Sequence, residues 1–351
     1  MKNISVGIIG AGGISVFHTQ AYQKLNNVNI IAVCDINEER AREYALKYNI
    51  LHVFTDYNEM LKLEELDAVS VTTWNNGHAH ISIAALKAGK NVLCEKPLAM
   101  NAIEAQEIVD VAKQTGKLLM VGFVRRFEEN VKLLKKSIEA GKLGKVYFVK
   151  TGYVRKWGNP GGWFSDKKRS GGGPVIDLGV HVIDLVGYVT GKPKAISVYA
   201  STFNYLGMKP NIKGMDKYNS LDYSEYNDVE DAATALIKYD NGMTLSFETS
   251  WVLHTKESHN YLNIYGDKAG TQMEPKLEFY EEEDNYFTEK TLVNTANNNF
   301  GNIFNKEIEH FIDCIGNGTP CINTGEDGVE IMKILDAIYE SSRTGHEVIL
   351  K

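Results

Sequence analysis

Short apolar runs rich in β-branched residues alternate with helical patterns from residue 1 to about 122. Between the runs, apolar residues recur with helical spacing near residues 14–25, 38–48, 80–88 and 101–115. Strands that alternate with helices in this way form a parallel sheet with helices on both faces. The sequence therefore predicts a doubly wound α/β domain, whose strands include Val6–Ile9, Ile30–Cys34, Ala68–Val71, Asn91–Cys94 and Leu118–Val121.

The rhythm changes after about residue 123. One helical pattern (128–140) is followed by longer strand patterns at 146–154, 195–201, 232–239 and 243–250, and a last helix is expected at 328–341. Asp240-Asn-Gly lies between two alternating runs, which is typical of a hairpin and so of antiparallel sheet. We divide the chain into a first domain at 1–123 and a second α/β domain at 124–351.

The composition excludes some classes of partner. The 351 residues are 43% apolar and 24% charged, with a net charge of −7 and dispersed basic residues, so nucleic acid is not an expected partner. No signal peptide and no uninterrupted membrane-spanning run is found, so we expect no membrane partner. The acidic run Glu281–Asp284 is expected in a solvated loop or strand edge.

The four cysteines are Cys34, Cys94, Cys314 and Cys321. None of their spacings is that of a CxxC metal site, and the first two fall inside strand patterns. They are expected to be buried thiols in a reducing compartment, which predicts a cytoplasmic protein.

A glycine loop joins the first strand to the first helix. Gly10 allows a tight turn, Gly12 lets the backbone approach a pyrophosphate, and Gly13 and Ile14 begin a helix whose N–H groups face that charge. Asp35 follows the second strand, where a carboxylate binds the adenosine ribose and repels a 2′-phosphate. The loop therefore predicts NAD as cofactor, in preference to NADP, although Ser15 stands at the third glycine position.

The stretch 173–190 is apolar on nearly every side of a helix except along Asp177, His181 and Asp184. These residues are at i, i+4 and i+7, so a regular helix would place them on one face. Burying two carboxylates and an imidazole is unfavourable without partners. The line is therefore either a satisfied buried network or the wall of a cavity that binds a polar ligand.

Lys96 follows the fifth strand, at the edge where open α/β sheets bind ligands, and Pro97 biases its backbone towards an extended form. Three segments occur together: Glu95-Lys96-Pro97, Thr72–His78 and Gly171–His181. With this combination the chain resembles the Gfo/Idh/MocA oxidoreductases. The resemblance covers essentially the whole chain, and Trp74 is a departure, because the family usually has proline there.

The resemblance implies an N-terminal Rossmann domain and a C-terminal α/β domain with a large, mostly antiparallel open sheet, through which the protein would form a homo-oligomer (dimer or tetramer). It implies that Lys96, Asp177 and His181 bind substrate and catalyse hydride transfer between nicotinamide and a secondary hydroxyl or ketone of a sugar, sugar derivative or inositol. The expected cofactor contacts, beyond the glycine loop and Asp35, are Thr73, Trp74, Asn75, His78, Glu95 and Lys96.

Further contacts of a sugar ring are sought among aromatic and polar residues of the second domain, and Arg155, Trp163 and His254 are the candidates. No metal is expected, because His78 and His80 lack an evident third ligand.

Three alternatives stay open at this point. A redox-neutral member of the family would oxidise its substrate transiently, eliminate a glycosidic group and reduce again. A sensor would keep the fold and the dinucleotide without chemistry, although the intact Lys96, Asp177 and His181 argue against that. The unpatterned segment 204–228 would be a lid, an arm that holds a partner subunit, or a disordered excursion.

Overall fold

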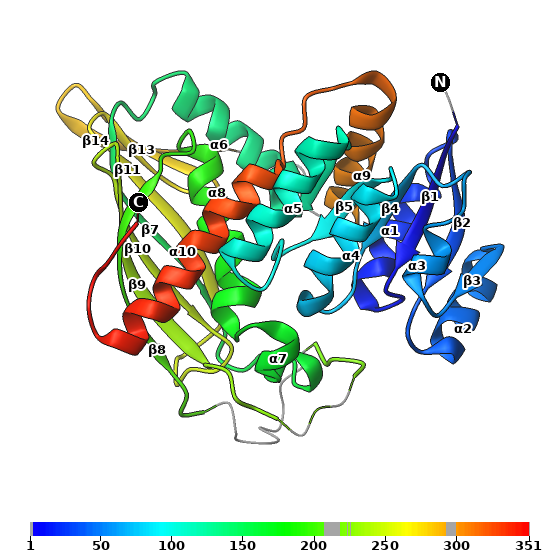
Figure 1. Ribbon diagram of the computed structural model, residues 1–351. Coiled ribbons are helices and arrows are strands. Elements are labelled where there is room, and N and C mark those ends of the chain that lie inside the picture. Colours follow the sequence, from blue (N-terminus) through cyan, green and yellow to red (C-terminus); the bar gives the residue numbers. More distant parts are fainter. Residues whose placement is uncertain (1–2, 207–217, 223, 225, 293–299, 351) are drawn as a thin grey trace. The chain divides into compact units, whose positions relative to one another are not determined.

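The computed structural model describes residues 3–206, 218–222, 224, 226–292 and 300–350 (Figure 1). The chain forms two compact units. Unit 1 contains Met1–Val124 and Asn299–Met332, and unit 2 contains Arg125–Asn298 and Lys333–Lys351. The first division lies one residue beyond the predicted boundary at 123, but the predicted second domain, 124–351, does not correspond to one unit.

Helix α9 (Phe300–Asn317) explains the return of the chain to unit 1. Phe304 of α9 stacks on Phe17 of α1 (Gly13–Tyr22), with 5.2 Å between ring centroids. Phe304 is fully buried. Local sequence patterns do not reveal such a contact, because its two sides lie far apart along the chain.

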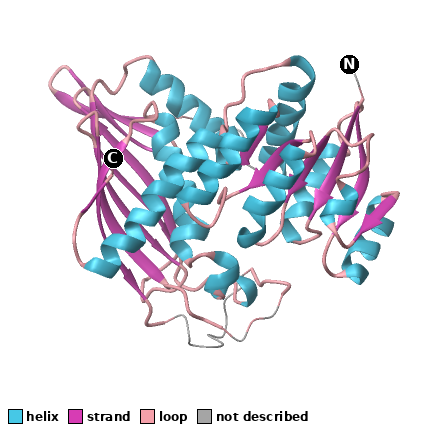
Figure 2. Cartoon of the chain, viewed as in Figure 1, coloured by secondary structure: helices cyan, strands magenta, loops and turns pink. Residues whose placement is uncertain are grey.

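Unit 1 is built on a six-stranded parallel sheet in the order β3-β2-β1-β4-β5-β6. The figures show helices around its strands (Figure 2), which fits the nearly continuous burial of β1, β4, β5 and β6. The predicted doubly wound α/β fold is confirmed. The strands are β1 (Ile4–Ile9), β2 (Val28–Cys34), β3 (His52–Phe54), β4 (Ala68–Val71), β5 (Asn91–Glu95) and β6 (Leu119–Gly122), and the helices besides α1 and α9 are α2 (Glu38–Tyr48), α3 (Tyr57–Met60), α4 (Asn75–Lys87), α5 (Ala102–Thr115) and the first part of α10 (Gly325–Thr344).

Unit 2 is built on a nine-stranded sheet in the order β14-β13-β12-β11-β7-β10-β9-β8-β15. The β7 and β10 strands are parallel neighbours and the other neighbours are antiparallel, so the predicted, mostly antiparallel sheet is confirmed. The strands are β7 (Val146–Val154), β8 (Ala195–Phe203), β9 (Ala232–Tyr239), β10 (Thr244–Ser250), β11 (His259–Gly266), β12 (Ala269–Gln272), β13 (Glu278–Glu283), β14 (Tyr286–Thr291) and β15 (Val348–Ile349).

Two turns of this sheet form where the sequence predicts them. Gly242, with φ +86°, and Asn241, whose side chain accepts the Met243 N–H at 3.0 Å, join β9 to β10. The acidic run 281–284 covers the end of β13 and its turn into β14, and from residue 282 onward it is exposed. Both predictions are confirmed.

The helical elements of unit 2 include α6 and α8, which pack on each other and, through α8, on β7. One stretch, Lys167–Val189, is long and apolar enough to cross a membrane, yet 83% of its apolar window is buried inside the protein, as in the core helix of a soluble protein. The helices are η1 (Val124–Phe127, at the division), α6 (Glu129–Glu139), η2 (Gly162–Ser165), α7 (Lys167–Ser170), η3 (Val175–Gly179), α8 (Val180–Val189) and the last part of α10.

The segment predicted to be a lid or arm, 204–228, contains residues 207–217, 223 and 225, which lie outside the described residues. That prediction stays untested.

Candidate functional site

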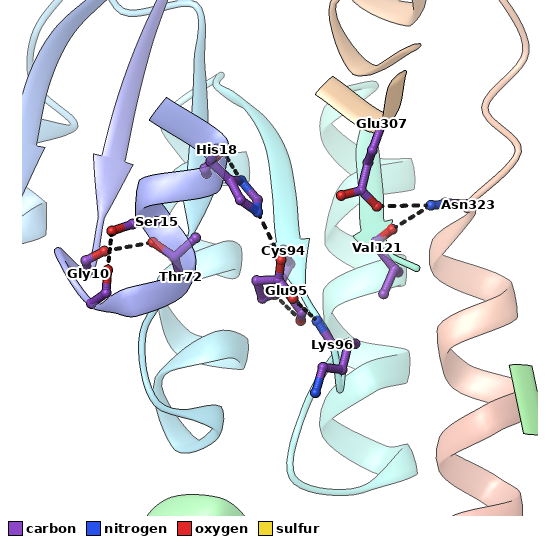
Figure 3. A network of polar contacts seen from close by, with 12 residues as sticks. Gly10, Ser15, His18, Thr72, Cys94, Glu95, Lys96, Val121, Glu307 and Asn323 are labelled. Atoms are coloured by element: carbon purple, nitrogen blue, oxygen red, sulfur yellow. Dashed lines mark hydrogen bonds and ion pairs between the residues drawn. The ribbon is translucent and has the colours of Figure 1, made fainter. Parts of the chain in front are cut away.

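The glycine loop lies at the carboxyl ends of β1 and β4, where the strand order of the sheet reverses. Gly10 has φ +98°, and a Cβ atom there would lie 2.7 Å from the carbonyl of Thr72, so only glycine fits. The Thr72 N–H donates to Ile9 O at 2.8 Å, and its hydroxyl donates to Gly10 O at 2.7 Å (Figure 3). The two strand ends are thereby joined at the place where such sheets bind dinucleotides.

The start of α1 fits a pyrophosphate. Gly12 is the N-cap, no side chain caps the helix, and its first turn has no acidic residue. A Cβ atom at Gly12 would meet nothing within 4 Å, so there is open space beside the backbone. The Ser15 hydroxyl donates to Gly12 O at 2.7 Å and leaves the first N–H groups to a ligand. Gly13 and Ile14 form the first turn, as predicted.

Asp35 directly follows β2 and is 7% exposed. Its Oδ2 accepts the Ala11 N–H at 2.9 Å, and its Oδ1 accepts the Asn37 N–H at 2.9 Å. The carboxylate therefore fixes the glycine loop, in addition to the ribose contact that the sequence predicts for it. This loop contact is not visible in the sequence, because it depends on the fold bringing Ala11 to the end of β2. Arg40 lies 3.6 Å from the same Oδ2.

Lys96 follows a buried carboxylate at the end of β5. Glu95 Oε2 accepts the Lys96 N–H at 3.1 Å, and Glu95 Oε1 lies 2.8 Å from His18 Nε2 (Figure 3). The other ring nitrogen of His18 lies 3.1 Å from the Ser70 hydroxyl. His18 is fully buried and Glu95 nearly so. Their contacts therefore hold the backbone at Lys96 in one position within unit 1.

Glu307 of α9 adds a second carboxylate to this cluster. Its Oε1 accepts from Asn323 Nδ2 at 3.4 Å, and its Oε2 has no partner among the described residues. Single ligand atoms of His18, Glu95 and Glu307 lie within 4.8 Å of one another, a combination that could hold a metal ion. Sequence reasoning weighed His78 and His80, the cysteines and the acidic run 281–284 as metal ligands and missed these three, which no local spacing connects.

The two carboxyl groups differ in protonation. Burial raises the pKa of Glu307 well above its usual value, and the negative charge of Glu95 adds to the rise. Burial also acts to raise the pKa of Glu95, but the hydrogen bond and charge of His18 outweigh it and the net shift is downward. Glu95 is therefore the ionised carboxylate beneath Lys96, and Glu307 is the protonated one.

The predicted cofactor residues Thr73, Trp74, Asn75 and His78 lie where β4 leads into α4. His78 is 1% exposed, with Nδ1 2.6 Å from Pro97 O and Nε2 3.2 Å from Thr73 O. Burial lowers its pKa. The neutral ring donates to only one of these two carbonyl oxygens, so His78 shapes this segment by lying between Thr73 and the loop after Lys96. Trp74 is the N-cap of α4, which begins at Asn75 and not near residue 80 as predicted.

In unit 2, a buried carboxylate holds the start of the apolar helix. Glu230 accepts the N–H groups of Gly173 and Val175, both at 3.0 Å, and the hydroxyl of Tyr339 at 2.9 Å. A Cβ atom at Gly173 would lie 2.0 Å from Glu230 O, so glycine is required there. Sequence reasoning missed Glu230, because nothing in its local sequence indicates a contact with residue 173.

The helix begins with a π turn, η3, before the α-helical geometry of α8. Its wider i+5 hydrogen bonding changes the angular offset between Asp177 and the residues that follow. Asp177 Oδ2 accepts from Trp251 Nε1 at 3.0 Å, whereas Asp184 pairs with Arg126 at 2.5–3.1 Å. The predicted single line is thus corrected: Asp184 belongs to a satisfied buried network, while Asp177 and His181 are half-buried.

The aromatic residues near Asp177 form a connected group. Trp163 stacks on Phe164 at 4.0 Å, and Phe164 meets the edge of Trp251 at 6.4 Å. The other two candidate sugar contacts, Arg155 and His254, have different surroundings. The Arg155 guanidinium lies over the Tyr153 ring at 5.2 Å and donates to Gly158 O at 3.4 Å, and His254 is exposed on the bend after β10.

Both units match known proteins. Residues 4–123 match the Gfo/Idh/MocA model described as "Oxidoreductase family, NAD-binding Rossmann fold", and 135–350 match its C-terminal α/β domain. D-glucoside 3-dehydrogenase of Escherichia coli K12 is 33% identical over 99% of this chain and 97% of its own length. Levoglucosan dehydrogenase of Pseudarthrobacter phenanthrenivorans is 29% identical over 77% and 73%.

Among solved structures, levoglucosan dehydrogenase in complex with NADH and levoglucosan superposes with a TM-score of 0.87, at 25% identity and 99% coverage of both chains. The family match includes the glycine loop, Asp35 and the strand end at Lys96, and its first part is an NAD-binding fold. The predicted resemblance and the predicted cofactor are confirmed, and the chain belongs to the Gfo/Idh/MocA family of NAD-dependent oxidoreductases.

Proposed function

We propose that this NAD-dependent oxidoreductase oxidises a secondary ring hydroxyl of a sugar or sugar derivative, a glycoside foremost, or reduces the corresponding ketone. The observation that carries the proposal is the Asp177 carboxylate, held by the Trp251 indole beside the stack of Trp163 and Phe164. Carboxylates bind hydroxyl groups and aromatic faces bind the apolar face of a pyranose. The similarity to a glucoside dehydrogenase over 99% of this chain, and to a levoglucosan dehydrogenase over 77%, supports this class.

The proposed catalytic residues are Lys96, Asp177 and His181. His181 accepts the proton of the hydroxyl that is oxidised, Asp177 orients the substrate, and Lys96 binds the same oxygen as its charge develops. Glu95 keeps the backbone at Lys96 in place.

The residues that hold NAD are proposed to be the glycine loop at the pyrophosphate and Asp35 at the adenosine ribose, with Thr73, Trp74 and Asn75 near the nicotinamide end. When bound, NAD supplies the acceptor of the hydride that leaves the substrate carbon. The open space beside Gly12 and the uncapped start of α1 fit this role.

The function is tested by following NADH formation with methyl and aryl glucosides, levoglucosan, free glucose and myo-inositol in parallel. We expect the glycosides to give the largest kcat/KM. Release of the aglycone from an aryl glucoside without net NADH would instead favour the redox-neutral reaction, and activity with myo-inositol alone would overturn the proposed substrate class.

We also propose a homo-oligomer formed through the sheet of unit 2. Tyr199 of β8 and Leu236 of β9 are direct neighbours in the sheet and are 53% and 44% exposed. Ile196 and Tyr147 of the same sheet are also exposed. Apolar side chains exposed over adjacent strands are typical of subunit interfaces.

The cytoplasm is the proposed location, since the four cysteines are free thiols.

A further inference from the structure

A second cluster of reactive side chains lies in the C-terminal half of α9 and in the loop that follows it. His310 and Cys314 are four residues apart on this helix, so they share a face, and Cys321 lies in the loop after it. One ligand atom from each of the three residues lies within 4.8 Å of the others. None of them belongs to the proposed NAD or sugar contacts.

The hydrogen bonds define the state of the imidazole. Ile322 N–H donates to His310 Nε2 at 3.1 Å, so Nε2 is the unprotonated ring nitrogen. Cys314 Sγ lies 3.5 Å from the same nitrogen. His310 is therefore placed to accept the proton of the Cys314 thiol.

The two thiols differ in exposure. Cys314 is buried, with 9% of its surface exposed, whereas Cys321 is half-buried. Attack on a small molecule in solution is thus open to Cys321, with Cys314 behind it. Reactive cysteines in redox proteins combine partial exposure with a neighbouring resolving thiol.

We propose that Cys314 and Cys321 form a redox-active dithiol that reacts with low-molecular-weight disulfides. Cys321 is the attacking thiolate, Cys314 the resolving thiol and His310 the base that deprotonates it. The dithiol takes no part in the proposed hydride transfer, and its test does not depend on the sugar substrate.

The electrostatics of the cluster agree with these roles. The hydrogen bond from Cys314 lowers the pKa of Cys321 to about 5 in spite of burial, and the hydrogen bond with His310 and then the Asn323 backbone contribute to the fall. The thiols within the sheet of unit 1 behave in the opposite way, since burial raises the pKa of both Cys34 and Cys94 to about 12. At neutral pH, Cys321 is therefore the reactive thiolate among the four cysteines.

The reaction balances in two exchange steps. The Cys321 thiolate attacks one sulfur of the disulfide RSSR, forms a mixed disulfide and releases RS⁻. Cys314 then loses its proton to His310 and attacks Cys321 Sγ, which breaks the mixed disulfide and releases the second RS⁻. The protein dithiol is oxidised to an intrachain disulfide, RSSR is reduced, and the released thiolates take up the two protons as 2 RSH.

A metal ion is the competing occupant, because thiolate and imidazole ligands also bind zinc. The contact from Ile322 N–H uses the lone pair of His310 Nε2 that faces the sulfur atoms. Metal binding through that nitrogen would have to break this hydrogen bond. Proton transfer from Cys314 to His310 uses the same lone pair and breaks the same hydrogen bond, so zinc binding and the dithiol are separated by the test that follows.

The test treats the reduced full-length protein with oxidised glutathione and maps the products by mass spectrometry. Both thiols lie in one tryptic peptide, residues 307–333, so the disulfide appears as the loss of two hydrogens, with two glutathione molecules released. The Cys314→Ser variant should hold one stable glutathione on Cys321, and Cys321→Ser should give neither product. His310→Asn should accumulate the mixed disulfide, with resolution slowed about tenfold. Cys34→Ser is the matched control and should react like the unmodified protein.

A second measurement uses the unmodified protein, so the proposal stays testable if a variant fails to fold. Alkylation of Cys321 by iodoacetamide should be nearly independent of pH between 6 and 8, whereas an ordinary thiol reacts about tenfold faster per pH unit in that range. Alkylation of Cys321 with the pH dependence of an ordinary thiol would overturn the proposal. So would one tightly bound zinc per chain that protects both thiols.

Discussion

Glu95 and Glu307 show how single residues of unit 1 carry different charges in one buried cluster. Glu95 is ionised beside His18, and Glu307 is held protonated by burial and by the charge of Glu95. Since the unfolded chain ionises Glu307 at its ordinary pKa, the folded state binds one proton more between that value and the raised one. Stability then falls as pH rises through this window, by up to about 1.4 kcal/mol per pH unit.

The Glu307→Gln variant should lose this contribution. An amide keeps the shape of the carboxylic acid and has no proton to release, so we expect the difference in melting temperature, variant minus unmodified, to increase from pH 5 to pH 8. Thermal unfolding at several pH values measures it. A constant difference over that range would contradict a raised pKa at Glu307.

Asp35 has two tasks, and substitutions can separate them. Titration calorimetry of the unmodified protein should show NAD bound more tightly than NADP, because the carboxylate repels a 2′-phosphate. Asp35→Ser should narrow that preference and also weaken NAD, since the Ala11 N–H loses its acceptor. Asp35→Asn keeps an acceptor oxygen and is the matched control for the loop. Equal affinity for both cofactors in the unmodified protein would contradict the role of Asp35.

Lys96 and His181 should behave as one catalytic set. His181→Asn and Lys96→Met should each lower kcat by roughly two or more powers of ten, and His181→Asn should leave NAD affinity intact. The double variant should be little worse than the poorer single variant, because both act on one proton transfer. Steady-state kinetics on the best glycoside gives the cycle, and fully additive losses would mean that the two residues act independently.

At the scale of elements, the start of the apolar helix depends on the hydrogen bonds that its N–H groups donate to Glu230. Tyr339→Phe removes one hydrogen bond to Glu230 and should cost about 1 kcal/mol. Glu230→Ala leaves the N–H groups of Gly173 and Val175 without acceptors and should cost roughly 3 kcal/mol. It should also lower kcat, because Asp177 follows in the same turn.

Urea unfolding and NADH formation measure both variants. If Glu230→Ala were no less stable than Tyr339→Phe, the backbone contacts would not hold the turn. Glu230→Gln retains one acceptor oxygen and is expected to fall between the two.

The elements with strong local patterns could be predicted from the sequence, and those that depend on distant contacts could not. The alternating strands, the glycine loop and the hairpin at Gly242 follow from residue spacing and turn chemistry. The short strand β3 was missed because three residues carry a weak pattern. Helix α9 was missed although its buried residues Ile303, Phe304, Ile308, Phe311 and Ile312 have helical spacing, and only its contact with α1 depends on the fold. The π turn was also missed, and with it the separation of Asp177 from Asp184.

The same limit applies to the candidate site. Motifs identify Lys96, Asp177 and His181 as candidates, but Glu230 and Glu307 act through contacts that only the fold creates. Ionisable residues of this kind carry no motif, since their role is set by burial and by neighbours from other elements.

At the scale of the whole molecule, the exposed apolar residues of unit 2 should determine the oligomeric state. Leu236→Glu places a charge beside Tyr199 on the open sheet and should shift the protein towards the monomer in light scattering. Leu46→Glu, on the exposed surface of α2, is the matched control and should leave the mass unchanged. An unchanged mass in both variants would contradict an interface at Leu236.

The return of α9 to unit 1 has a consequence for synthesis. A ribosome releases the strands and helices of residues 1–124 well before it reaches residues 299–332, which belong to the same unit. Until then the nascent sheet lacks Phe304, the stacking partner of Phe17, and Asn323, whose side-chain amide donates to Val121 O and whose backbone C=O accepts the Val121 N–H. Unit 1 can be completed only after nearly all of unit 2 has been translated. Although its synthesis begins first, unit 1 therefore cannot finish folding before that point.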